Sequence, residues 1–252
     1  MRKGAALSRV MRQPFASAQC NLGTFYKEGR GAVQSDAEAA RWYKDAANQG
    51  DAQALFNLGI CWNTGCGVAR SDVEAARCFR QAAERGHAAA QCNLAGAILE
   101  GRGVPQSDAE AAAWLKRAAK QGYAKAQFAM GSIVEHENDE EAAQWYTKAA
   151  NQGHAEAQVS LGELIGSGRG LEQSAKEAAR WYKMAAEQGH VKAQYLMGVS
   201  AECGHGVVQS DEHAARWYRR AADQGCAAAQ FAAAQFSLGA ILSEGRDEVQ
   251  SE

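Results

Sequence analysis

A thirteen-residue string that occurs six times is the feature that most constrains this chain. The string reads EAARWYKDAANQG at Glu38–Gly50, and closely similar strings begin at residues 74, 110, 141, 177 and 213. Self-similarity of this kind indicates a repeat architecture, because one repeat cannot bury its own apolar face and stacked neighbours complete the core. The chain is therefore predicted to be an array of helical repeats that forms a single elongated domain.

A second string, close to A-Q-x-x-L-G, fixes the register of the array. Its marks Leu22, Leu58, Leu94 and Met130 are spaced by 36 residues, and the following spacings are 31, 36 and 41. The predicted units are about 16–51, 52–87, 88–123, 124–154, 155–190 and 191–226, with a basic segment at 1–15 and a half unit at 227–252. The short fourth unit lacks five residues in the connection His136–Glu140, so the stack is expected to be least regular there and at the duplicated AAQFA of the half unit.

Each unit is predicted to contain two helices joined by a G-x-G loop. A glycine in the middle of the first helix costs about 1 kcal/mol relative to alanine, so its recurrence predicts close approach of a neighbouring helix at Gly23, Gly59, Gly131, Gly162, Gly198 and Gly239. The first loop glycine suits a left-handed helix end. An apolar residue after it is expected to pack on the core, namely Val33, Val68, Val104, Leu171 and Val207.

The second helix of each unit begins with a pattern that is typical of a capping box. Ser35-x-x-Glu38 recurs at Ser71, Ser107 and Ser174, and the pattern predicts reciprocal hydrogen bonds between side chains and backbone N–H groups. Ser210 is followed by His213 instead of glutamate, which predicts a weaker start for that helix. Pro14 is expected to open the first helix of the array.

Together the two strings resemble the Sel-one-like repeat, a relative of the tetratricopeptide repeat, over about residues 16 to 245. The resemblance implies an all-α fold, a right-handed superhelical solenoid of antiparallel helix pairs, whose members act as adaptors or scaffolds in protein complexes. It implies no shared enzyme activity. A cysteine-rich secreted branch of the family joins the two helices of each repeat by a disulfide, but this chain has alanine at the second of those positions, at Ala47, Ala83, Ala119, Ala150, Ala186 and Ala222.

Composition narrows the function classes further. The net charge of -2 gives the whole chain no electrostatic preference for nucleic acid or anionic membrane. Seven cysteines that do not recur as a fixed pair predict reduced thiols in a reducing compartment. We therefore expect a cytoplasmic monomer with no nucleic-acid or membrane partner. The basic opening MRKGAALSRVMRQP leaves organellar targeting open as the alternative.

No motif with catalytic or metal-binding spacing is present. The sequence has no S-x-x-K, G-x-S-x-G, P-loop or H-E-x-x-H pattern. Cys203, His205, His213 and Cys226 share one unit, but they are placed at different ends of its helix pair and do not predict a zinc site. We predict no catalytic residue, no cofactor and no metal, hence no enzyme. A β-lactam-binding or hydrolysing enzyme remains an alternative by family analogy only.

The second helices also carry two columns of basic residues: Arg41, Arg77, Arg180 and Arg216, and Lys44, Arg80, Lys116, Lys183 and Arg219. Such columns could bind RNA or an acidic partner. Glutamates three residues before Arg41, Arg77 and Arg180 favour ordinary surface ion pairs instead.

The favoured binding surface is a stripe on the first helices, which line the concave groove in superhelices of this kind. The stripe consists of residues one position before, two after and six after the register residue of each first helix. The predicted site residues at these positions are Asn21, Thr24, Glu28, Asn57, Ile60, Thr64, Asn93, Glu100, Ser132, His136, Ser160 and Glu163. Asparagine has both a donor and an acceptor for a peptide backbone. The alternative is that these asparagines form hydrogen bonds within the stack. The prediction is a non-enzymatic scaffold that binds a protein or peptide in this groove.

Overall fold

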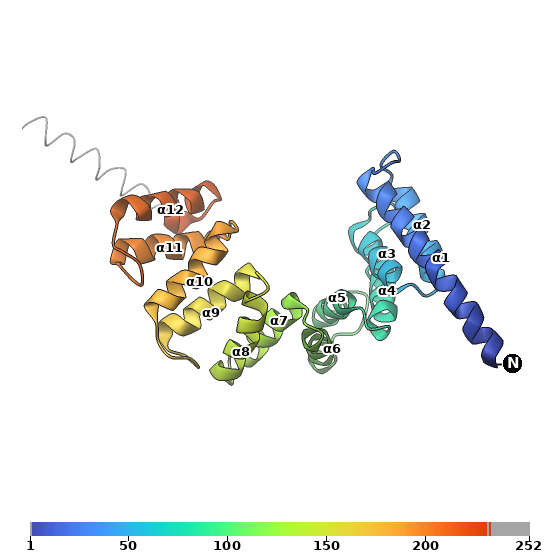
Figure 1. Cartoon of the computed structure of the whole chain (residues 1–252), viewed down its shortest axis with the longest axis horizontal. Coiled ribbons are helices and arrows are strands. Elements are labelled where there is room, and N and C mark those ends of the chain that lie inside the picture. The colour runs from blue at the N-terminus through green and yellow to red at the C-terminus, as the bar shows by residue number, and fades with distance from the viewer. Residues whose placement is uncertain (1, 231, 233–252) are drawn as a thin grey trace, which may run out of the picture. The chain divides into compact units, whose positions relative to one another are not determined.

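The computed structural model describes residues 2–230 and 232, and this part of the chain contains helices and no strand. We number the repeats 1 to 6 by the unit ranges given above. The first helices of the repeats are α1 (Arg2–Glu28), α3 (Ala52–Thr64), α5 (Ala88–Leu99), α7 (Ala124–Val134), α9 (Ala155–Ser167) and α11 (Val191–Cys203). The second helices are α2 (Asp36–Asn48), α4 (Asp72–Glu84), α6 (Asp108–Lys120), α8 (Asp139–Ala150), α10 (Ala175–Glu187) and α12 (Asp211–Asp223) (Figure 1). The all-α helix-pair prediction is confirmed, and most of the expected half unit 227–252, with Gly239, lies outside the described residues.

The start of the first helix differs from the prediction. α1 begins at Arg2 and runs through Pro14 to Glu28, so Pro14 does not open it and the basic segment is helical. The residues before Pro14 include Ala5, Ala6, Leu7 and Met11, which have high helix propensity.

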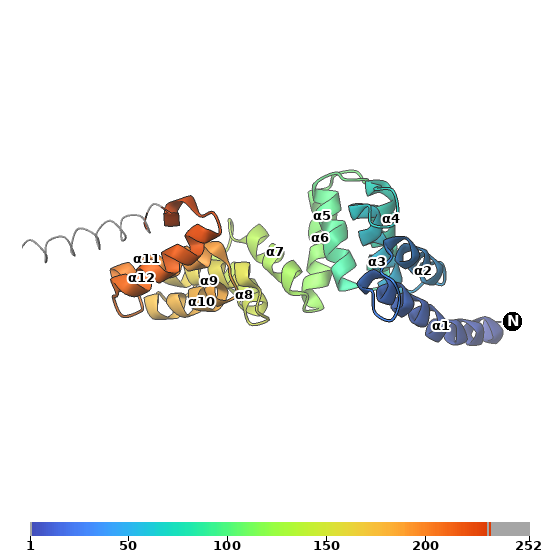
Figure 2. The ribbon, with the colours of Figure 1, turned by 90° about the horizontal axis from the view of Figure 1, so that it is seen from above.

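Two compact units divide the chain, residues 1–126 and 127–252, with the boundary inside α7. Within the first unit, α1 packs on α2, α2 on α3, α3 on α4, α4 on α5 and α5 on α6. Within the second unit, α8 packs on α9, α9 on α10, α10 on α11 and α11 on α12 (Figure 2). The boundary falls in repeat 4, the repeat with the shortened connection.

Half of the predicted capping box is confirmed. Ser35 Oγ accepts a hydrogen bond from the Glu38 N–H at 3.3 Å, and Ser71, Ser107 and Ser174 do the same in their repeats. The reciprocal half is wrong, because the Ser35 N–H donates to the Tyr26 carbonyl of the preceding helix instead of to a glutamate. His213 therefore does not remove a cap: Ser210 still accepts from its N–H.

The glycines that were predicted to mark a close approach lie against aromatic rings in the described repeats, namely Gly23, Gly59, Gly131, Gly162 and Gly198. A Cβ atom on Gly59 would be 2.7 Å from Phe79 Cδ1, and one on Gly162 would be 2.5 Å from Tyr182 Cε1. The close approach predicted from the sequence is therefore that of a ring on the second helix of the same repeat. Repeat 3 supports this explanation, because it has Ala95 at the glycine position and Leu115 at the ring position.

The loop glycines serve two purposes. Gly65, Gly168 and Gly204 end their helices in the left-handed conformation, as predicted. The second glycine of the loop touches the previous repeat: a Cβ atom on Gly103 would be 2.2 Å from the Asp72 carbonyl oxygen. Val33 was predicted to pack on the core, but it is 89% exposed. Its position in the repeat is one residue later than that of Val68, and it corresponds to Val208, which is also exposed.

A glutamine relay with one buried and one exposed member joins successive repeats, which the sequence analysis missed. Gln188 Nε2 donates to Gln158 Oε1 at 2.9 Å, and Gln158 Nε2 donates to the Ala150 carbonyl of the previous repeat at 3.1 Å. The same relay occurs in two further repeats, through Gln121 and Gln91 and through Gln224 and Gln194. Repeat 2 has Leu55 and Arg85 at the two positions, so both partners are replaced together.

Candidate functional site

The predicted stripe residues have two kinds of surroundings. Several form hydrogen bonds within the repeat stack: Asn57 Nδ2 donates to Cys20 Sγ at 3.7 Å, and Thr24 Oγ1 lies 3.3 Å from the Tyr43 hydroxyl. Tyr146 donates to Ser132 Oγ at 3.2 Å. At these positions the polar atoms have a structural partner already, which is the alternative left open by the sequence.

The remaining stripe residues are more available to a partner. Asn21, Thr64 and His136 are exposed and Ile60 is half-buried, whereas the half-buried Ser160 shares a hydrogen bond with Tyr146. Three glutamates form ion pairs at the surface: Glu28 with Arg30, Glu100 with Arg102, and Glu163 with Lys192. The twelve residues divide between the two compact units, with those up to Glu100 in the first unit and those from Ser132 onward in the second.

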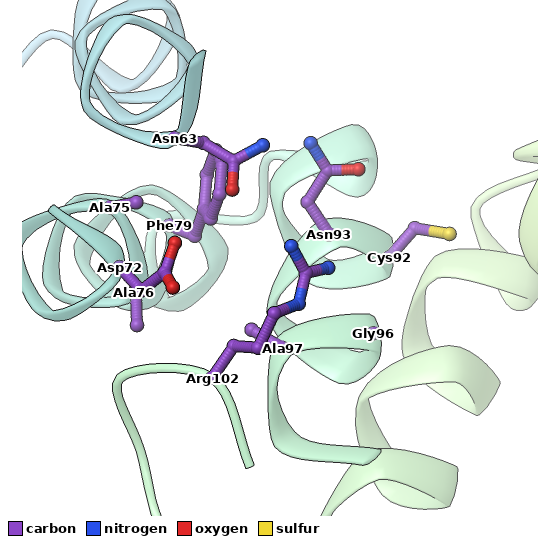
Figure 3. Close-up of a pocket in the computed structure, with 10 residues that line it drawn as sticks. All are labelled: Asn63, Asp72, Ala75, Ala76, Phe79, Cys92, Asn93, Gly96, Ala97 and Arg102. Atoms are coloured by element: carbon purple, nitrogen blue, oxygen red, sulfur yellow. The ribbon is translucent and has the colours of Figure 1, made fainter. Parts of the chain in front are cut away.

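Asn93 lines a cavity of about 200 Å³ in the first unit. Asn63 of α3, Asp72 of α4 and Arg102 of the loop after α5 line it from the other sides. Figure 3 shows these four polar side chains turned toward the same space. Sequence analysis placed Asn93 in the stripe and missed the other three residues.

The cavity exists because Gly96 has no side chain. The corresponding positions in the other repeats hold Thr24, Ile60, Ser132, Glu163 and Val199. A Cβ atom on Gly96 would meet no atom within 4 Å. A glycine at a position where every other repeat has a larger side chain is the sequence signal that could have identified the cavity.

A comparison with repeat 5 shows that the cavity lacks a hydrogen bond between Arg102 and Asp72. There Arg169, which corresponds to Arg102, donates to Asp139 through Nε at 3.0 Å and also lies 3.4 Å from Glu135. Asp139 corresponds to Asp72. In the cavity Asp72 Oδ1 is buried and accepts no hydrogen bond from any described residue, although Arg70 Nη2 lies 3.6 Å away.

The lining groups of the cavity offer hydrogen bonds and charge to a ligand. The cavity has a carboxylate acceptor, a guanidinium donor and two amides that both donate and accept. Burial raises the pKa of the Cys92 thiol, so this cysteine is protonated at neutral pH and is a poor nucleophile. No group of three or more metal-ligating side chains is found among the described residues.

The surface ion pairs predicted on the second helices are present in the first two repeats. Glu38 lies 3.7 Å from Arg41 and Glu74 lies 3.5 Å from Arg77. Arg80 is paired differently, since its Nη1 donates to Glu110 of the next repeat at 2.7 Å. None of the helices in the described part of the chain is long and apolar enough to cross a membrane.

A protein-family model matches this chain once in each of the six predicted repeats. The family model described as Sel1 repeat matches residues 16–51, 52–87, 88–123, 124–154, 155–190 and 191–226. A comparison with curated proteins found no match.

Solved structures share the fold. A protective antigen of uropathogenic Escherichia coli with an SLR fold is 33% identical with a TM-score of 0.78, and the alignment covers 89% of this chain and 49% of that protein. This chain therefore spans about half the length of that antigen. A Sel1 repeat protein from Oxalobacter formigenes is 31% identical with a TM-score of 0.75, over 83% of this chain and 86% of that one. An immunity protein from Pseudomonas aeruginosa, 18% identical over 89% of this chain and 82% of its own with a TM-score of 0.54, shares the fold alone.

Proposed function

Because the chain belongs to the Sel1 repeat family, we propose that it is a non-enzymatic scaffold that binds a protein or peptide partner on the surface of its first helices. Members of this family generally mediate protein interactions. The observation that carries the proposal is the polar cavity at Asn93, Asp72 and Arg102. The partner would insert one side chain there and contact the exposed stripe residues around it.

The cavity suits a single side chain of a partner. Its volume is about 200 Å³, which exceeds the volume of one buried water several times over. It lies between packed helices whose core residues Phe79 and Leu94 are buried, so its shape exists before a partner binds. A preformed site loses little conformational entropy on binding.

The test is capture of partners from the native organism with the wild-type chain and with Gly96→Ile. Isoleucine stands at the equivalent position of repeat 2, and the open space at Gly96 accepts it without a clash at Cβ. The variant is expected to fill the cavity, to keep the fold and to lose the partner. Arg77→Ala on the second helix of repeat 2 is the control that should retain it.

Asn93→Ala provides a second variant for the same experiment. It removes an amide that faces the cavity and should weaken capture without filling the space. If Gly96→Ile and Asn93→Ala both capture the same proteins in the same amounts as the wild type, the first-helix surface is not the binding site. The helical fold would be unaffected by that result.

A further inference from the structure

A second candidate site lies in the second unit, between the two second helices α10 and α12. Two adjoining hollows of about 460 and 610 Å³ share Lys183 and Val207. We call their combined surface the α10–α12 groove. Its basic residues are Lys176, Arg180, Lys183, Arg216, Arg220 and the histidine His213.

Cations exceed carboxylates in this groove. Glu177 is the acidic residue among the described lining residues. Lys183 Nζ lies 3.8 Å from Glu187, and Arg216 is paired with Glu212 on the same helix. These side chains are largely exposed, and exposed pairs of this kind contribute little, so the cations can exchange them for a bound anion.

The floor of the groove is apolar. Met197 and Ala201 of α11 and Val207 of the following loop line it, together with Trp217 of α12. Val208 at its edge is 86% exposed. A ligand that covers this floor needs apolar groups as well as negative charge.

The equivalent place between repeats 2 and 3 holds a glutamate that accepts two hydrogen bonds. Glu110 corresponds to His213, and it accepts from Arg80 Nη1 of the previous repeat at 2.7 Å and from Trp114 Nε1 at 3.3 Å. These hydrogen bonds lower the pKa of Glu110, which shows that the surroundings stabilise a carboxylate. Glu141 accepts from Trp145 in the same way.

The equivalent place between repeats 5 and 6 retains two donors and lacks the acceptor. Lys183 corresponds to Arg80 and Trp217 to Trp114, whereas His213 replaces the glutamate. In the described part of the chain no hydrogen bond equivalent to the Trp114–Glu110 bond reaches Trp217. A carboxylate from another molecule has the same two donors available to it.

We infer that the α10–α12 groove binds an acidic peptide segment whose carboxylate takes the place of the missing glutamate, between Lys183 and Trp217. Further acidic residues of the peptide pair with Arg180 and Arg216, and its aliphatic side chains cover Val207 and Val208. A nucleic acid offers anionic phosphates but no aliphatic groups for this floor, so the groove favours a peptide. The site uses none of the residues of the Asn93 cavity and is independent of the function proposed above.

The probe is a fluorescein-labelled peptide of alternating glutamate and leucine, titrated with the full chain and followed by fluorescence anisotropy at low salt. The decisive variant is His213→Glu, which restores the residue that the other repeats carry. Glutamate in the first turn of α12 interacts favourably with the helix dipole, so the variant should melt no lower than the wild type. We expect it to bind the peptide at least about tenfold more weakly, because the site then contains its own carboxylate.

Lys183→Glu should weaken binding of the acidic peptide by a similar factor. The affinity of Arg77→Glu, on the second helix of repeat 2, should stay within about twofold of that of the wild type. A matched peptide with lysine in place of glutamate should not bind. The inference is overturned if His213→Glu binds the acidic peptide as tightly as the wild type does. It is also overturned if a uridine homopolymer binds more tightly than the peptide and loses affinity in the same variants.

Discussion

The contact between Gly59 and Phe79 makes a quantitative prediction about the core of a repeat. In Gly59→Ala the new Cβ atom would be 2.7 Å from the Phe79 ring and 3.3 Å from Cys78 Cβ. Phe79 is 4% exposed, so the ring cannot move into solvent. Overpacking of this kind costs about 1–3 kcal/mol, and the higher helix propensity of alanine offsets about 1 kcal/mol of that. We expect a net loss of up to about 2 kcal/mol in the free energy of unfolding.

The matching change in the partner should remove this loss. Phe79→Leu alone leaves unfilled space and destabilises the chain. The double variant reproduces the Ala95 and Leu115 pair of repeat 3 and should be more stable than the sum of the two single changes by about 1–2 kcal/mol. Urea unfolding followed by circular dichroism measures all four proteins of the cycle.

A helix glycine without such a contact is the control. Gly96 has no atom within 4 Å of the Cβ position, so Gly96→Ala should raise the free energy of unfolding by up to about 1 kcal/mol. If Gly59→Ala is tolerated as well as Gly96→Ala is, or if the Gly59 and Phe79 changes simply add, the explanation of the helix glycines by ring packing is refuted.

Three further perturbations test other parts of the fold. In urea unfolding, Gly103→Ala should destabilise the chain by more than Gly31→Ala does. Both glycines have positive φ, but of the two only Gly103 lies against the Asp72 carbonyl oxygen. Equal losses in the free energy of unfolding would contradict this explanation. Gln158→Leu should cost about 0.5–1.5 kcal/mol in the same assay, because it removes the hydrogen bonds to the Ala150 carbonyl and from Gln188, while Ala150 keeps its bond from the Gly153 N–H; a neutral effect would show that the relay is dispensable. Burial lowers the pKa of His87 from 6.5, so below that pH the unfolded chain takes up a proton that the folded chain does not, and stability falls as pH falls. His87→Asn keeps a helix cap that does not titrate, and thermal melts across this pH range should show a smaller acid loss; an unchanged loss would contradict the assignment.

The fold was predictable from the sequence wherever one residue decides a local conformation. Ser71 at a helix start and Gly65 at a helix end have the roles that their types favour. Contacts between helices were less accessible. The sequence indicated that something approaches Gly59 closely, but only the structure identifies the Phe79 ring, because the two positions lie on different helices.

The candidate sites were predictable in part. Asn93 was in the predicted stripe, yet the cavity depends on Asp72 and Arg102, which come from another helix and a loop. Gly96 was not among the predicted site residues, because nothing in the sequence shows that a missing side chain leaves space between two helices. The relay of Gln91 was missed because a glutamine in a repeated motif does not reveal that its amide is buried against the previous repeat.

Hydrogen–deuterium exchange of the full chain, alone and with its captured partner, tests the proposed function most directly. We expect the partner to slow exchange in α5 and in the loop that carries Arg102, and to lose this effect in Gly96→Ile. Protection that leaves α5 unchanged, or that persists undiminished in Gly96→Ile, would contradict binding through the first-helix surface.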